Sequence, residues 1–212
     1  MAKELAKGIY ALHTNLTDSP YFEGFWSIPT GVTLNSYLVV GEKIALIDIC
    51  NDSTDSLSNI ENQLKEIGIS MANIDYVILN HLESDHSGAL SAFLDKNDKA
   101  QILSSAKGIA LVKNFCKIDE EHRFKVLTDL EQLSLGNNKT LQFFETPNVH
   151  WPETIMTYEI SSGTLFSCDG FGSYGKTGEK LLDTEFSEGE LVDLEKEALR
   201  YYANIVASFS LF

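Results

Sequence analysis

The stretch at residues 80–88 reads NHLESDHSG, and it follows the apolar run IDYVIL at residues 74–79. The apolar run predicts a buried strand. Alternate residues of a strand point to opposite faces, so closely spaced ligands after it need an irregular loop to face one point. We therefore expect a metal-binding loop at the end of this strand. Its four candidate ligands stand within six positions: His81, Glu83, Asp85 and His86.

The composition is that of a globular protein with an acidic surface. The chain has 212 residues, of which 43% are hydrophobic, and this is enough for one substantial core. Its 31 acidic and 16 basic side chains give a net charge of −15, so nucleic acid and membrane surfaces are not expected partners. No run approaches the roughly 20 apolar residues of a membrane span, and the N-terminus lacks a signal-peptide core. The three cysteines are isolated, which predicts a reducing, cytoplasmic location.

The order of apolar runs predicts an α/β sandwich. No repeat or linker divides the sequence, so residues 1–212 are interpreted as a single domain. Strands and helices are expected to alternate up to residue 116, and strands dominate from there to residue 167. Two packed sheets with helical layers would satisfy this order. The expected strands are 36–40, 43–49, 76–79, 101–103, 124–127, 140–145, 154–160 and 164–167, and the expected helices are 55–67, 87–94, 106–115 and 190–208.

Two later segments also place a potential metal ligand in a loop beside a predicted strand. His150 lies in PNVHWP at residues 147–152, and Asp169 follows an apolar run that ends at residue 167. The alternative for all these residues is an exposed acidic loop with solvated histidines, and the density of ligand types argues against it. The other two histidines, His13 and His122, have no ligand beside them and are interpreted as surface residues.

The order His81, Glu83, Asp85, His86, His150, Asp169 resembles the metal motif of the metallo-β-lactamase fold. More narrowly, it resembles the diiron domain of flavodiiron proteins, also called A-type flavoproteins, which reduce O2 or NO. Hydrolases of this fold carry HxHxDH, whereas this chain has HxExDH, with Glu83 in place of the second histidine. The resemblance covers nearly the whole chain. It implies a four-layer αββα sandwich.

The resemblance also implies a cofactor of two Fe ions. By the family pattern His81, Glu83 and His150 hold one iron, Asp85 and His86 hold the other, and Asp169 bridges them. A carboxylate-rich donor set favours iron over zinc. The implied ligand is O2, with NO as a second one, at an iron pair bridged by an oxo or peroxo group.

Four residues are weaker candidates for roles around the metals. Asp48, at a strand end, is a candidate for orienting a ligating histidine, or is a simple strand-end cap. Trp151 is a candidate wall of the site, or ordinary core. Glu23 either approaches the iron pair or faces water. Tyr174 either donates a hydrogen bond to bound oxygen or lies at the surface.

The chain departs from the family pattern in two ways. Family enzymes continue into a flavodoxin-like domain that carries FMN, and no flavodoxin domain or FMN is expected here. The family also takes a last histidine ligand from a segment well beyond residues 201–204, and no histidine follows His150. We therefore expect the C-terminal part of the fold to be missing; the alternative is that fewer protein ligands hold the second iron and water fills the gap.

These departures leave three functional hypotheses. The first is a non-haem diiron protein of an anaerobe that binds O2 as an oxygen or redox sensor, with a signalling protein as partner. The second is an O2 or NO reductase that takes electrons from a separate flavin or rubredoxin donor. The third is a metal-dependent hydrolase, which Glu83 disfavours. A homodimer is left open.

Overall fold

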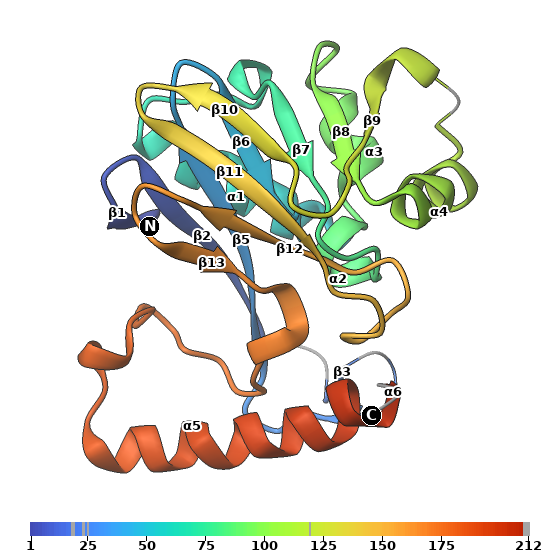
Figure 1. Ribbon diagram of the computed structural model, residues 1–212. Coiled ribbons are helices and arrows are strands. Elements are labelled where there is room, and N and C mark those ends of the chain that lie inside the picture. The colour runs from blue at the N-terminus through green and yellow to red at the C-terminus, as the bar shows by residue number, and fades with distance from the viewer. Residues whose placement is uncertain (18–19, 23, 25, 119, 210–212) are drawn as a thin grey trace.

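Two β-sheets pack face to face, and helices cover the outer face of the larger sheet (Figure 1). The structure is a computed structural model that describes residues 1–17, 20–22, 24, 26–118 and 120–209. The larger sheet has the order β1-β2-β5-β6-β7-β8-β9, and the smaller has the order β10-β11-β12-β13. A short third sheet joins β3 (Tyr21–Phe22) to β4 (Trp26–Ser27).

The strands of the larger sheet are β1 (Lys3–Ala6), β2 (Ile9–Leu16), β5 (Val32–Val40), β6 (Ile44–Ile47), β7 (Tyr76–Ile78), β8 (Gln101–Ser104) and β9 (Phe124–Val126). Those of the smaller sheet are β10 (Gln132–Gly136), β11 (Lys139–Glu145), β12 (Ile155–Glu159) and β13 (Thr164–Phe166). The helices are α1 (Thr54–Glu66), α2 (Ser84–Ser87), α3 (Leu90–Leu94), α4 (Ala106–Cys116), α5 (Glu188–Tyr201) and α6 (Ala207–Phe209), with a π-helical turn at Tyr202–Val206 between the last two. Short 3-10 helices lie at Met71–Asn73, Glu121–Arg123, Cys168–Phe171 and Asp183–Glu185.

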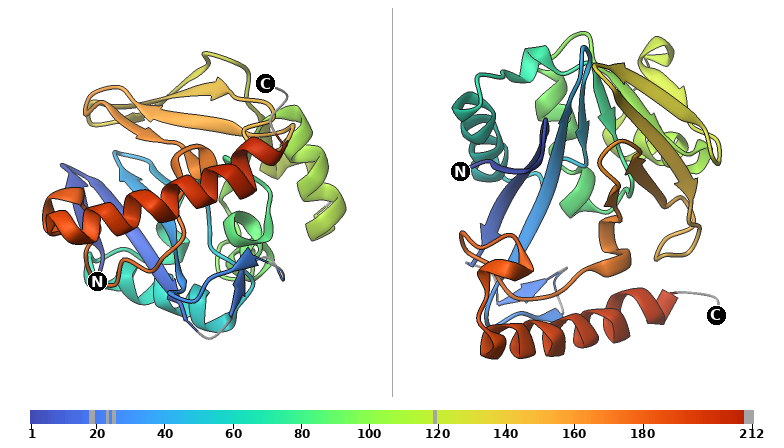
Figure 2. Two further views of the ribbon diagram at one scale, coloured as in Figure 1. Left: turned by 90° about the horizontal axis from the view of Figure 1, so that it is seen from below. Right: turned by 60° about the vertical axis from the view of Figure 1, so that its left-hand side comes forward.

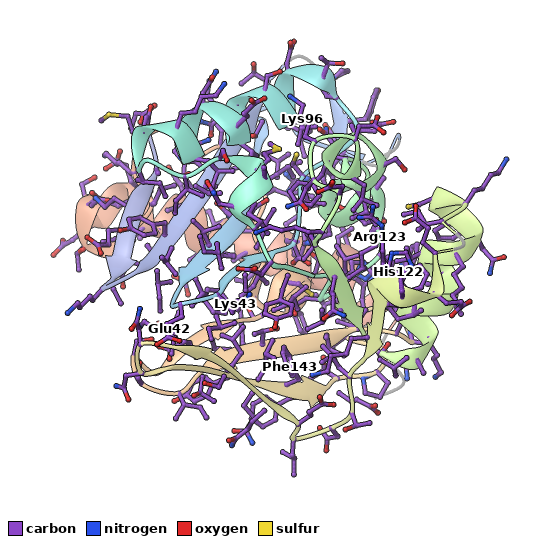
Figure 3. The ribbon with its side chains drawn as sticks, turned by 90° about the horizontal axis from the view of Figure 1, so that it is seen from above. Glu42, Lys43, Lys96, His122, Arg123 and Phe143 are labelled. Atoms are coloured by element: carbon purple, nitrogen blue, oxygen red, sulfur yellow. The ribbon has the colours of Figure 1, made fainter. Side chains whose placement is uncertain are left out.

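Each face of the larger sheet belongs to a different core. Leu38 of β5 packs among the residues of α1, α3 and α4, whereas its neighbour Val39 packs between the two sheets. This follows from the alternation of side chains along a strand. Phe143 of β11, labelled in Figure 3, belongs to the core between the sheets. Both faces of the larger sheet are therefore buried.

The sandwich is closed at the end opposite α2. The turn between β5 and β6 lies beside β10 and β11, as Glu42 and Lys43 show in Figure 3. The backbone N–H of Lys43 donates to the carbonyl of Leu135 at 2.8 Å. A Cβ atom at Gly41 would stand only 2.4 Å from that carbonyl oxygen, so this close approach requires glycine. The two sheets are held together here, and the loops at the other end are left to build a site.

Helix α5 crosses the open end of the sandwich (Figure 2). Tyr201, Ile205 and Val206, at and after its C-terminal end, pack with Phe22 and Tyr174 in a third buried cluster. The helix begins at Ser187, whose hydroxyl accepts from the backbone N–H of Glu190. Because its C-terminal end packs in this third cluster, α5 lies over the loops that follow the strands.

Most predicted elements are present, with local differences. The helix predicted at 87–94 is two short helices, because α2 ends at Ser87 and Ala89, with φ −80° and ψ 2°, departs from helical geometry before α3 begins. Strands β1 to β4 and β10 were not predicted, and the helix predicted at 190–208 is interrupted by the π-helical turn.

The two histidines assigned to the surface differ. His122 is exposed beside Arg123, near α4 (Figure 3). The surface assignment of His13 was wrong, because the side chain is only 4% exposed. It lies on β2 beneath α1, where Asn59 and Gln63 donate to its backbone carbonyl. In the described part of the chain, no helix is long and apolar enough to cross a bilayer.

Candidate metal centre

The candidate ligands come from strand ends of both sheets. β6, β7 and β8 run parallel, so their C-terminal ends share one edge. Asp48 follows β6, and the loop with His81 and Glu83 follows β7. His150 lies between β11 and β12, and Asp169 lies in the 3-10 helix after β13. The site is therefore assembled across the open end of the sandwich.

The first ligand group consists of His81, Glu83, His150 and Asp169, each of which offers one atom within 4.8 Å of the others. Glu83 Oε2 lies 3.2 Å from His81 Nε2 and 3.0 Å from His150 Nε2. Asp169 Oδ2 lies 3.2 Å from His150 Nε2 and 3.6 Å from His81 Nε2. All four side chains thus converge on one point.

The second ligand group consists of Asp85, His86 and Asp169. His86 Nε2 lies 3.0 Å from Asp169 Oδ1 and 3.5 Å from Asp85 Oδ2. Asp169 therefore turns one oxygen to each group, which is the arrangement of a carboxylate that bridges two metal ions. Metal binding by these six residues stays a prediction, and the structure brings all six together.

Two buried carboxylates orient the histidines from behind. The Nδ1–H of His81 donates to Glu153 Oε1 at 2.8 Å, and that oxygen also accepts from the backbone N–H of Leu82 at 3.2 Å. The Nδ1–H of His86 donates to Asp48 Oδ2 at 3.1 Å. A carboxylate at Nδ1 fixes the tautomer and leaves Nε2 free to ligate. Asp48 was a candidate for this place, whereas Glu153 was not predicted to have a role.

In the first ligand group, the imidazoles and the carboxylates stabilise each other's charged forms, and this shifts their pKa values. Burial lowers the pKa of His81, but hydrogen bonds to Glu153 and Glu83 outweigh burial and raise it to about 9. Burial raises the pKa of Glu83, yet hydrogen bonds from His150 and His81 bring it down to about 2. The carboxylates therefore hold positive charge among them, as protons on imidazole here and as metal ions when these are bound.

In the second ligand group, the carboxyl of Asp85 has a buried oxygen without such hydrogen bonds in the described part of the chain. Burial raises the pKa of Asp85 to about 6, even though the neighbouring His86 lowers it. Its Oδ1 is buried and makes no hydrogen bond within the described residues. Such a buried oxygen is costly unless something else satisfies it. A cation between Asp85, His86 and Asp169 would do so, and the residues present therefore fit a second metal ion.

The remaining predicted residues lie in different places. The ring of Trp151 packs edge-on against His81 with centroids 5.0 Å apart, so it forms one wall of the first group. Tyr174 is fully buried, so the surface alternative was wrong. Glu23 falls outside the described residues. Sequence reasoning missed the role of Tyr201, whose hydroxyl donates to Asp169 Oδ1 at 2.7 Å.

A cavity of about 250 Å³ lies beside the second ligand group, and we call it the inner pocket. Asp85, His86 and Asp169 form its polar side. Its other walls include Leu34, Tyr174 and Tyr201, together with Phe22 and Val32. A small ligand in this space would touch the second group on one side, and apolar side chains together with polar residues such as Thr33, Asn35 and Ser173 elsewhere.

Comparisons with known proteins agree with this architecture. A family model described as "ODP family beta lactamase" matches residues 32–200. The curated protein "Anaerobic nitric oxide reductase flavorubredoxin" of Aliivibrio fischeri is 39% identical over 180 residues, which is 85% of this chain and 35% of that protein. Its homolog from Escherichia coli O157:H7 is 37% identical over 182 residues, which is 85% of this chain and 42% of that protein. The chain thus spans less than half the length of these relatives.

Solved structures give the same result. A flavoprotein from Thermotoga maritima superposes with a TM-score of 0.87 at 30% identity, covering 99% of this chain and 50% of that one. Rubredoxin oxygen:oxidoreductase from Desulfovibrio gigas superposes with a TM-score of 0.86 at 29% identity, covering 97% of this chain and 49% of that one. The chain spans about half of each of these structures.

Proposed function

The chain belongs to the ODP family of β-lactamase-like proteins, and from that premise we propose that it holds two iron ions and binds O2, with NO as a second ligand. The observation that carries the proposal is Asp169, whose two oxygens face two separate groups of ligands. His81, Glu83 and His150 would hold one iron, and Asp85 and His86 the other. The names of the relatives, which include a nitric oxide reductase and an oxygen oxidoreductase, support this choice of ligands.

The donor set favours iron over zinc. Three carboxylates and three imidazoles form a site richer in oxygen donors than the histidine- and cysteine-rich sites that zinc prefers. When bound, an iron pair supplies one-electron exchange from each ion. The chain's own contribution is to offset the charge of the ions with Glu83, Asp85 and Asp169 and to keep the imidazoles oriented through Glu153 and Asp48.

The protein also controls access to the pair. His81 is fully buried and walled by Trp151, whereas the side chain of Glu83 is 17% exposed, so solvent approaches the first ligand group mainly at Glu83. The second group faces the inner pocket, so an exogenous ligand is expected on that side. Tyr201 already donates one hydrogen bond to Asp169 there, which fixes the bridging carboxylate.

Metal analysis under anaerobic conditions tests the proposal. Protein purified and loaded with Fe(II) without oxygen is expected to bind two irons per chain, and Mössbauer spectra should show both ions oxidise together when O2 is added. A sample that binds one ion per chain, or that prefers zinc and cleaves nitrophenyl esters, would favour the hydrolase instead.

The relatives' names support a second candidate function, reduction of NO or O2 with electrons from a separate flavin or rubredoxin donor. Stopped-flow measurements with an added flavoprotein donor distinguish a reductase from a protein that binds the gas as a sensor. Sustained formation of N2O or water near the ~10 s⁻¹ typical of enzymes indicates a reductase. Uptake of one equivalent of ligand without turnover indicates a sensor, for which a signalling protein is the proposed partner.

A further inference from the structure

A second pocket lies on the outer side of Tyr201 and is mainly apolar. This outer pocket, of about 350 Å³, is lined by residues of the 3-10 helix after β13 and of the C-terminal part of α5. Three large apolar side chains that line it are exposed to solvent: Phe171 by 80%, Leu199 by 64% and Tyr202 by 55%. Clustered exposure of this kind around a cavity is typical of a binding or entry site rather than of ordinary surface.

The outer and inner pockets are adjacent and share part of their lining. Asp169, Phe171, Gly172 and Tyr201 line both of them. The ring of Tyr201 lies so close to Gly172 that a Cβ atom there would stand 2.5 Å from its Cε1. The wall that the two pockets share is therefore formed by the ring of Tyr201, packed on Gly172, together with Asp169 of the second ligand group.

The helix that carries Tyr201 changes its winding at this point. The π-helical turn at Tyr202–Val206 begins directly after Tyr201, which is 4% exposed, whereas Tyr202 is 55% exposed. Single π turns inside helices occur often at functional sites. Tyr201 thus belongs to the wall between the pockets, and Tyr202 lines only the outer pocket.

We infer that neutral diatomic gases reach the second ligand group through the outer pocket and pass the ring of Tyr201 when this ring moves away from Gly172, because the two are in contact in the structure. O2 and NO are small and weakly polar, so they partition into apolar space that hydrated ions avoid. Glu195 at the edge of the pocket, together with the net charge of −15, repels anions. The inference rests on the proposed gas-binding function and adds the route by which the ligand enters.

Xenon binding tests the route without any reaction at the metals, because apolar cavities take up this inert gas. Crystals of the iron-loaded protein pressurised with xenon are expected to show a xenon atom in the outer pocket, near Leu199 and Val206. Xenon found only elsewhere, or nowhere in the crystal, overturns the route. This readout does not depend on O2 reactivity, so a failed route is distinguishable from a failed function.

A substitution that fills the outer pocket supplies the kinetic test. Ala198→Phe adds a ring on the helix face that lines the pocket, and we expect it to abolish xenon binding there and to slow O2 binding to the diferrous protein about tenfold. Leu191→Phe, at an exposed position of the same helix outside both pockets, is the matched control and should bind O2 at the wild-type rate. An O2 rate for Ala198→Phe within about twofold of wild type would contradict the route.

Discussion

Three histidines at the candidate centre all present Nε2 to the acidic groups, and the hydrogen bonds of Nδ1 account for this in two of them. Glu153 holds His81, and Asp48 holds His86, so each ligand group has one imidazole fixed by a buried carboxylate. The sequence identified the six candidate ligands because their types are dense and their spacing is unusual. It did not identify the role of Glu153, because the contact with His81 joins residues 72 positions apart and no local pattern marks it.

Removing the charge of Glu153 should weaken metal binding without removing a ligand. Glu153→Gln loses the acceptor that fixes the Nδ1–H of His81, and we expect iron affinity to fall about tenfold to a hundredfold. Competition with a chelator under anaerobic conditions measures this. Glu145→Gln changes an exposed glutamate of β11 and is the control, with affinity expected to match wild type. Equal iron affinities for the two variants would contradict a role of Glu153 in metal binding.

Restoring the hydrolase motif at position 83 should change the choice of metal. Glu83→His replaces an oxygen donor by an imidazole between His81 and His150, which makes the first group similar to the histidine-rich sites that zinc prefers. We expect the ratio of zinc to iron bound from an equimolar mixture to rise at least about tenfold, as measured by elemental analysis. An unchanged ratio would mean that Glu83 does not select the metal.

At the scale of helices and strands, the periodicity of apolar residues predicted some elements and missed others. Helix α1 and strands β6 to β8 were predicted closely, because their apolar spacing follows one buried face or a continuous buried run, whereas only residues 36–40 of β5 were predicted. The fold class was likewise predicted, and the structural neighbours confirm it. Strand β2 was missed because both faces of the larger sheet are covered, so His13 and Thr14 are buried beside apolar residues and no alternation appears.

Strand β12 ends in a buried acid, Glu159, that the sequence did not mark. Burial alone would raise the pKa of Glu159, but hydrogen bonds from Ser162 and Ser161 outweigh burial and lower it from 4.5 to about 2. Lys139 of β11 also donates to this carboxylate at 3.2 Å. A carboxyl whose pKa is lowered by folding stabilises the native state fully above its unfolded pKa, and the stabilisation is lost as the pH falls towards the folded pKa.

Glu159 should therefore set part of the acid sensitivity of the fold. Glu159→Gln leaves Lys139 without its charge partner and is expected to lower the free energy of unfolding by roughly 3 kcal/mol near neutral pH. The difference from wild type should shrink as the pH falls from about 4.5 towards 2, as followed by urea unfolding at a series of pH values. Glu145→Gln should run parallel to wild type. A constant difference at all pH values would contradict the assigned pKa.

At the scale of the whole molecule, Asn80 joins the two sheets directly beside the ligand loop. Its Nδ2 donates to the carbonyl of Phe166 at 3.0 Å, and its Oδ1 accepts from the hydroxyl of Thr157 at 2.7 Å. Its backbone carbonyl accepts from the N–H of Ile155 at 2.9 Å, and its own N–H donates to Asp48. One fully buried residue thus fixes β7, which leads to His81, against β12 and β13, which lead from His150 and towards Asp169.

Asn80→Ala should affect stability and metal binding together. It leaves the buried hydroxyl of Thr157 and the carbonyl of Phe166 without their partner, so we expect a loss of about 3 kcal/mol, or roughly 10 °C in Tm. Because the two halves of the centre then lose their common anchor, the iron content should fall below two per chain.

Asn97→Ala is the matched control for this last effect. Asn97 is also buried and donates to two carbonyls, at Met71 and Ile74, but it lies in the loop between α3 and β8 and belongs to neither ligand group. It should lower Tm by a similar amount and keep two irons per chain at temperatures where it is folded. If both variants lose iron in proportion to their loss of stability, the centre depends on the global fold alone. If only Asn80→Ala loses iron, the register between the two sheets is what builds the site.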